Sequence, residues 1–184
     1  VANNGDNTLH LTSVFNPSGG AAYDAGGLCG ILFCPQADRR CESPVINCTG
    51  LNAITLDFNY IEGGDGLLDN ATVWYNDGIS WAQINDPTKT LTGCGGQGLW
   101  TSQTIVLPAS ADNNPNVRIA FHWINNDDGV GTDPSFAVDD IVVTGSAAAL
   151  PVVTITPSPN DSLCQSSTLT LNGSATNGPI TAWA

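Results

Sequence analysis

Acidic side chains gather between Asn125 and Val143, in the segment Asn-Asn-Asp-Asp-Gly-Val-Gly-Thr-Asp-Pro-Ser-Phe-Ala-Val-Asp-Asp-Ile-Val-Val. The segment holds five of the chain's 17 Asp and Glu residues. Carboxylates close to backbone carbonyl groups are the ligands that a hard cation such as Ca²⁺ takes in proteins. The sequence therefore predicts Ca²⁺ as a cofactor, with an acidic turn that only keeps the surface solvated as an equally compatible interpretation.

The predicted cation ligands come from the end strand and from two early segments that should meet it at one edge of the fold. The first choice is Asp139 or Asp140 together with Glu42 and Asp24. The second choice lies inside the acidic loop, among Gly and Pro residues that favour turns, and consists of Asp127, Asp128 and Asp133.

The strand after this loop breaks its own alternation. Phe136 and Val138 lie on one face of a half-buried strand, and the same phase would carry Asp140 into the core. A β-bulge at Asp139-Asp140 would return Ile141 and Val143 to the inner face and would re-aim a carboxylate. We expect such a bulge.

Three tryptophans are the candidate ligand-binding residues, because sugar rings stack on exposed aromatic faces. They are Trp74, Trp81 and Trp100. For any one of them, packing inside the fold or beneath a loop is the more frequent alternative. The expected ligand is a glycan or a protein partner.

Catalytic signals are sparse. His10 and His122 are the only histidines, and neither Gly-x-Ser-x-Gly nor His-Glu-x-x-His occurs. Two carboxylates could hydrolyse a glycosidic bond, but Asp is so frequent that almost any pair could be nominated. The sequence predicts a protein that is not an enzyme.

Charge and composition exclude several partners and indicate the fold class. Four Lys and Arg residues against 17 Asp and Glu give a formal charge of −13, which repels nucleic acid and anionic membranes. No apolar run is long enough to span a bilayer, so direct membrane insertion is not expected. With 20 Gly, 11 Pro and only 11% charged residues, the chain is typical of an all-β protein rich in turns.

About eight short strands are expected within residues 1–145. The clearest alternation runs from Asn52 to Tyr60, and Asn76-Asp77-Gly78 predicts a hairpin turn. Further apolar alternations occupy 8–14, 40–46, 71–75, 100–107, 117–124 and 136–144. This pattern predicts an antiparallel two-sheet jelly-roll sandwich.

The domain organisation follows from composition. A small-residue linker at 146–151 separates the sandwich module, residues 1–145, from residues 152–184, which look like the incomplete start of a second β-sandwich domain. Since the sequence has neither an initiating Met nor a signal peptide, we expect a mature or excised piece, with further domains of the same chain after Ala184.

Six cysteines in a chain without methionine indicate an oxidising, extracellular setting. Cys29 and Cys34 flank a short loop and are the first choice for a disulfide, and Cys48 and Cys94, each beside a turn that contains Gly, are the other candidates. Cys41 is left over, and Cys164 has no partner within its own segment.

Several motifs together resemble a module found in secreted, multidomain surface proteins of Bacteroidota. They are Ala21 to Gly30, Glu42-Ser-Pro-Val-Ile, Leu56 to Glu62, Val73-Trp-Tyr-Asn-Asp-Gly, Leu107-Pro-Ala-Ser-Ala and Asn125 to Ile141. The ending Phe136-Ala-Val-Asp-Asp-Ile also resembles MAM-like and carbohydrate-binding jelly rolls, and residues 152–184 resemble the start of an immunoglobulin-like or PKD-like repeat. The resemblance implies type IX secretion and, at Asp161-Ser162-Leu163, O-glycosylation of Ser162.

These observations favour a non-catalytic, calcium-stabilised adhesion module outside the cell or at its surface. It would recognise a glycan or a surface protein. Two alternatives stay open: an accessory module of a secreted hydrolase, and a structural stalk or filament subunit.

Overall fold

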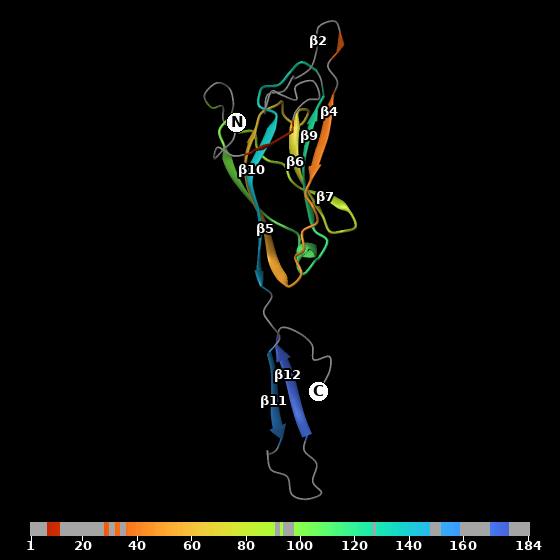
Figure 1. Cartoon of the computed structure of the whole chain (residues 1–184), viewed down its shortest axis with the longest axis vertical. Helices are drawn as coiled ribbons and strands as arrows, with labels where there is room; N and C mark the ends of the chain where they lie inside the picture. Colours follow the sequence, from red (N-terminus) through yellow and green to blue (C-terminus); the bar gives the residue numbers. More distant parts are fainter. Residues whose placement is uncertain are drawn as a thin grey trace, which may run out of the picture. The chain divides into compact units, whose positions relative to one another are not determined.

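The structure is a computed structural model that describes residues 7–11, 28–29, 32–33, 36–90, 93, 98–126, 128–147, 152–158 and 170–176. The chain divides into two compact units, Val1–Ser146 and Ala147–Ala184. Figure 1 shows the strands of both units. Among the described residues, no helix is long and apolar enough to cross a bilayer.

The first unit is built from two four-stranded antiparallel sheets, ordered β1-β10-β5-β8 and β4-β9-β6-β7 (Figure 1). The strands are β1 (Leu9–Leu11), β4 (Ala37–Glu42), β5 (Leu51–Glu62), β6 (Asn70–Asn76), β7 (Trp81–Asn85), β8 (Thr101–Val106), β9 (Arg118–Asn125) and β10 (Phe136–Ala147). A short ladder, β2 (Leu28–Cys29) with β3 (Leu32–Phe33), and a 3-10 turn, η2 (Ala109–Ala111), complete it.

The strand pairing follows a simple rule along the chain. Among the strands of the two large sheets, the first pairs with the last (β1 with β10), the second with the seventh (β4 with β9), the third with the sixth (β5 with β8), and the middle two with each other (β6 with β7). This is a hairpin of strand pairs rolled into two layers, which is the jelly-roll topology. The predicted all-β jelly-roll sandwich is confirmed.

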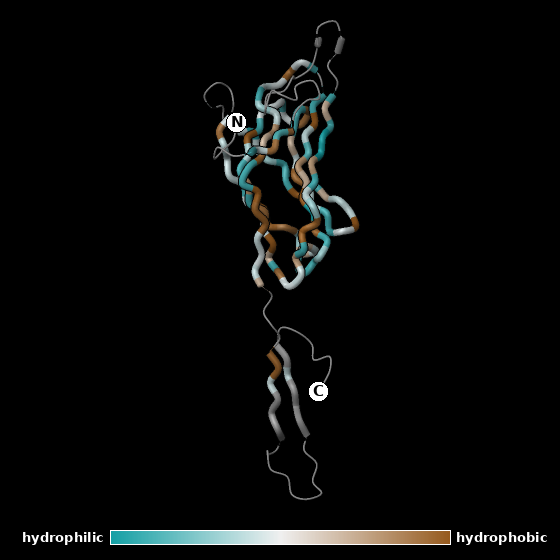
Figure 2. The backbone as a smooth tube through the Cα atoms, viewed as in Figure 1, coloured by the Kyte–Doolittle hydropathy of each residue, from teal (hydrophilic) through white to brown (hydrophobic). Residues whose placement is uncertain are grey.

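The core lies between the two sheets, where every second residue of each strand faces inward. Ile54, Leu56, Phe58 and Tyr60 of β5 are between 0% and 3% exposed, as their alternation predicts. The Phe58 ring meets Phe121 of β9 edge-on at 5.2 Å, which joins the two layers. Figure 2 shows both brown (apolar) and teal (polar) stretches of backbone within this unit.

The predicted hairpin connects β6 to β7. Asn76 Oδ1 accepts the Gly78 N–H at 2.8 Å, and Asp77 Oδ1 accepts those of Ser80 and Ile79 at 2.9 and 2.8 Å. These backbone donors lower the pKa of Asp77. Gly78 has φ +96°, a conformation that favours glycine.

The predicted phase break at the start of β10 is present. Asp140 has φ +52°, the left-handed conformation expected at a bulge. Phe136 and Val138 are buried before it; after it Val143 packs partly against the same core, whereas Ile141, predicted to do the same, is 45% exposed. The inward phase therefore changes by one residue at Asp139-Asp140.

The second unit contains two strands, β11 (Val152–Ser158) and β12 (Thr170–Thr176). They pair antiparallel from Val152 opposite Thr176 to Ser158 opposite Thr170. An immunoglobulin-like or PKD-like continuation stays a prediction.

Candidate functional site

The outer surface of the sheet β4-β9-β6-β7 carries two of the three candidate tryptophans. Trp74 faces outward because its neighbours Val73 and Tyr75 are buried, at 0% and 3% exposure. Trp81 pairs with Asn76 at the start of β7, on the same side of the sheet. We call this surface the tryptophan face; its outward residues include Asp38, Arg40, Glu42, Thr72, Trp74, Asn76, Trp81, Gln83, Arg118, Ala120 and His122.

The Trp74 indole is held in place by its neighbours. Its Nε1–H donates to Thr72 Oγ1 at 2.8 Å, and its ring meets His122 edge-on at 6.2 Å. His122 Nε2 lies 2.6 Å from Asp38 Oδ1. Ala120, paired with Trp74 across the ladder, is 0% exposed. The indole is therefore half-buried and fixed in orientation before any ligand arrives.

Trp81 lies within a cluster of positive charge. The Arg40 guanidinium sits 4.6 Å from its ring centroid, a cation–π contact. Arg40 also donates twice to Glu42 Oε1, at 3.0 and 2.7 Å, whereas Arg118 Nη1 lies 3.7 Å from Glu42 Oε2. One carboxylate thus faces two guanidinium groups, so this part of a strongly acidic chain carries local positive charge.

The outer surface of the other sheet has a different character. Short polar side chains pair with one another there: Asp57 with Thr104 at 2.5 Å, Asn59 with Ser102 at 2.6 Å, and Thr55 with Thr144 at 2.7 Å. Groups that satisfy one another offer less to a ligand than groups without partners. The tryptophan face is therefore the better candidate for recognition.

Trp100 does not join the other two tryptophans. It lies directly before β8 in the first sheet and packs, partly buried, against Ile61 and Ala137. Sequence alternation could not distinguish this packed indole from the two on the tryptophan face.

The acidic pair at the bulge of β10 bonds to the two neighbouring parts of the first sheet, β5 and the residue before the edge strand β1. Asp140 Oδ2 accepts the Asn59 side-chain N–H at 2.8 Å on the outer surface of the first sheet. Asp139, 6% exposed, accepts the Thr8 hydroxyl at 3.1 Å and the Asp140 N–H at 2.8 Å. Both carboxylates are engaged in local bonds on that surface.

The third acid of the predicted set, Glu42, lies in the other sheet, where two arginines engage its carboxylate. The set Asp139 or Asp140 with Glu42 and Asp24 stays a prediction. Asp24 and Asp127 lie outside the described residues. Asp128 accepts the Asn126 side chain and the Val130 N–H, both at 2.8 Å, and these bonds lower its pKa. Asp133 precedes a cis proline, Pro134.

No group of three or more His, Cys, Asp or Glu side chains that could hold a metal ion occurs within the described ranges. Ca²⁺ binding therefore stays a prediction. If the folded chain binds Ca²⁺, added Ca²⁺ should raise the melting temperature and a chelator should lower it, because a ligand of the folded state stabilises that state by mass action. Differential scanning fluorimetry measures the melting temperature. Identical melting curves with chelator and with added Ca²⁺ would show that the folded chain does not bind Ca²⁺.

The cysteine prediction needs one correction. Cys48, expected among the disulfide-forming residues, is a free thiol, and so is Cys41. Cys48 is 1% exposed within the core, and this burial, with a smaller contribution from Asp112, raises its pKa. Apolar packing, not a covalent link, explains its position. Cys34, Cys94, Cys164, Ser162 and the side chain of Cys29 lie outside what the structure describes.

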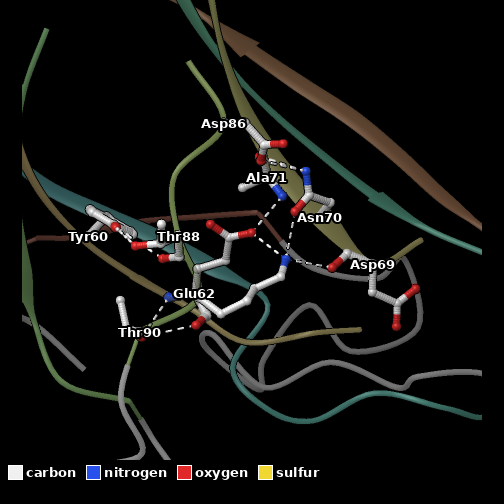
Figure 3. Close-up of polar contacts among 9 residues, drawn as sticks. Tyr60, Glu62, Asp69, Asn70, Ala71, Asp86, Thr88 and Thr90 are labelled. Atoms are coloured by element: carbon white, nitrogen blue, oxygen red, sulfur yellow. Dashed lines mark hydrogen bonds and ion pairs between the residues drawn. The ribbon is translucent and has the colours of Figure 1, made fainter. Parts of the chain in front are cut away.

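A buried ion pair at the end of β5 was not predicted (Figure 3). Glu62 is 0% exposed, and its Oε1 accepts Lys89 Nζ at 2.5 Å and the Ala71 N–H at 2.9 Å. Lys89 Nζ also donates to the Asp69 carbonyl at 2.8 Å and to Asn70 Oδ1 at 2.7 Å. The ammonium group thus contacts three oxygen atoms.

The segment that carries Lys89 is bound tightly to β5. Thr90 N–H donates to the Glu62 carbonyl at 2.9 Å, and Glu62 N–H donates to Thr90 Oγ1 at 3.1 Å. Tyr60 Oη donates to the Thr88 carbonyl at 3.0 Å. One feature of the sequence could have pointed to this ion pair, namely the scarcity of the two residue types. Lys89 is the chain's only Lys, and Glu62 is one of two Glu.

Burial raises the pKa of Glu62 to about 7, and this effect outweighs the opposing attraction of Lys89. The second carboxylate oxygen, Oε2, is buried without a hydrogen-bond partner among the described residues. The pair lies between the ends of the two sheets, since Glu62 ends β5 and Ala71 belongs to β6. We assign it a structural role.

No family model matches the chain, and no curated protein matches it. Among solved structures, the K3 cleaved adhesin domain of Lys-gingipain from Porphyromonas gingivalis w83 is similar, with a TM-score of 0.40 and 17% identity. The match covers 66% of this chain and 71% of that one. A likeness of this size carries no information about ligand or activity.

Proposed function

We propose that the unit Val1–Ser146 is a non-catalytic extracellular or cell-surface adhesion module that recognises a glycan through its tryptophan face. The observation that carries this proposal is the placement of two fixed, half-buried indoles, Trp74 and Trp81, beside Arg40 and Arg118 on one sheet surface. Recognition of a surface protein through the same face is the second candidate. Four further features remain predictions from the sequence: Ca²⁺ binding, a Cys29–Cys34 disulfide, type IX secretion and glycosylation of Ser162.

The carboxylate, imidazole and hydroxyl of Asp38, His122 and Thr72 follow the order of a hydrolytic triad. Two features oppose that role. Thr72 Oγ1 is 3.4 Å from His122 Nδ1 and accepts the Trp74 indole N–H. Moreover, β6 is paired on both sides, by β7 and β9, so most of its backbone N–H groups are used by the ladders, with one irregularity on the β7 side between Val73 and Trp74. These three side chains position Trp74.

Replacing Trp81 by Ala should weaken glycan binding by more than tenfold, because a central tryptophan commonly contributes 2 kcal/mol or more to an interface, about 30-fold in affinity. A glycan array followed by calorimetry measures it. Trp100→Ala is the matched control, since it removes the same side chain from the other sheet and should leave affinity unchanged. Equal losses for both variants would contradict the assignment of the face.

Trp74→Ala should also weaken binding, with a loss of stability below the roughly 3–5 kcal/mol of a fully buried tryptophan, because the indole is only half-buried. Denaturant unfolding gives that loss. A wild-type protein that binds no glycan, together with a Trp74→Ala loss at the top of this range, would identify the module as a structural spacer.

A further inference from the structure

A pocket of about 250 Å³ opens at the hairpin end of the tryptophan face. Its lining combines one indole and one valine with two amides and one guanidinium, and consists of Val45, Asn76, Gly78, Trp81, Asn116 and Arg118. This is smaller than the roughly 300–1,000 Å³ typical of sites for drug-sized ligands. The pocket suits a single ring-sized group.

The polar groups of this pocket are mostly uncommitted. Asn76 uses only its Oδ1 in the turn, and the Asn116 side-chain amide, the Trp81 Nε1–H and the Arg118 guanidinium make no hydrogen bond within the described part of the chain. Because these groups are mainly N–H donors, they match a ligand rich in oxygen acceptors.

The walls of the pocket are fixed in advance. Asn114 Nδ2 donates to the Asp77 carbonyl at 2.8 Å and to the Ser110 carbonyl at 2.9 Å, which ties the hairpin to the neighbouring loop. A Cβ atom at Gly78 would lie 2.8 Å from Asn116 Cβ, so the hairpin tip packs directly against that residue. A site that needs no reorganisation loses less affinity on binding.

Charge selects the ligand further. Among the residues that the structure describes, Arg118 is the only charged one lining the pocket, in a chain whose formal charge is −13. Its ion pair with Glu42, at 3.7 Å, is loose, whereas Arg40 takes the closer position at 2.7 Å. At physiological salt, acidic groups farther away than about 8 Å are largely screened, which leaves Glu42 and the hairpin residue Asp77 as the acids closest to the guanidinium. Since the Glu42 carboxylate is held more closely by Arg40, the Arg118 guanidinium is the group in the pocket that can pair with a bound anion.

We propose that this pocket is a subsite for an acidic sugar, with the Arg118 guanidinium on the carboxylate of a hexuronic acid residue and the pyranose against Trp81. The inference rests on the proposed glycan recognition and names its ligand class. Asn76 and Asn116 hydrogen-bond the ring hydroxyls.

The test uses the full chain and paired probes: oligosaccharides of galacturonic and glucuronic acid, and their methyl esters, which keep the ring but lose the charge. The wild type should bind an acid form at least tenfold more tightly than its ester, and less tightly as salt rises. Arg118→Gln should lose about ten- to a hundredfold in affinity for the acid, as expected for a hydrogen bond to a charged group, and little for the ester.

Arg39→Gln is the matched control, because Arg39 is exposed on β4 and lies outside the pocket, so the same change in charge should leave affinity unchanged. Equal binding of acid and ester that depends on Trp81 but not on Arg118 would overturn the subsite and keep the proposed function. Absence of binding to any glycan would overturn both. Tighter binding of Asp- and Glu-rich peptides than of the oligouronides would replace the acidic sugar by an acidic peptide.

Discussion

Replacing Lys89 by Met is expected to lower the free energy of unfolding at pH 8 by about 3–5 kcal/mol. The variant keeps the length of the side chain but leaves Glu62, which is 0% exposed, without the ammonium 2.5 Å away. It also removes the donor to the Asp69 carbonyl and to Asn70 Oδ1. Urea unfolding at equilibrium measures the loss.

Arg39→Met is the control for this experiment, because it removes one positive charge from an exposed position on β4. Its effect should stay within about 0.5 kcal/mol. The double variant Glu62→Gln with Lys89→Met should recover part of the loss, since it removes the stranded carboxylate as well as its partner. A Lys89→Met variant as stable as the wild type at pH 8 would show that the pair contributes nothing.

Glu62→Gln is expected to change how stability depends on pH. The folded state raises the pKa of Glu62 from 4.5 to about 7, so folding favours the protonated acid. The resulting stabilisation is complete below about pH 4.5 and is lost as pH rises to about 7. A shift of this size corresponds to about 3 kcal/mol.

We therefore compare the free energies of unfolding of the wild type and of Glu62→Gln at two pH values. The wild type should gain stability relative to the variant when the pH is lowered from 8 to 5. Other carboxyl groups, including Asp77 and Asp128 with their lowered pKa values, occur in both proteins and cancel in this difference. A difference that stays constant between pH 5 and pH 8 would mean that Glu62 titrates alike in the folded and unfolded chain.

Much of the fold could be predicted because its strands are short and alternate strictly. The inward set from Ile54 to Tyr60 required only the two-residue period of a strand with one buried face. The bulge followed from the same rule, since burying Asp140 would cost more than inserting one extra residue. The turn at Asn76 to Gly78 was signalled by residues that tolerate positive φ.

The candidate site was less accessible, because it depends on which strands become neighbours. Period-two alternation separates inward from outward positions but does not assign an outward residue to one sheet or the other. Trp74 and Trp100 both qualified, and only the pairing places Trp100 against Ile61 in the other sheet. Likewise, Asp140 and Glu42 could be nominated together until pairing put them in different sheets. Glu62 and Lys89 meet through a loop, which leaves no periodic signal.

The pairing of the first strand with the last also determines when this unit can fold. Leu9 cannot meet Val138, and Ala37 cannot meet Asn125, until almost the whole module has been synthesised. Folds dominated by such distant pairings reach the native state in milliseconds to seconds, far more slowly than folds built from local contacts. A chain emerging from the ribosome would therefore stay unfolded for most of its synthesis, with open strand edges that need protection from aggregation. That delay leaves the two sheets incomplete until the last strand, β10, is available to pair with β1.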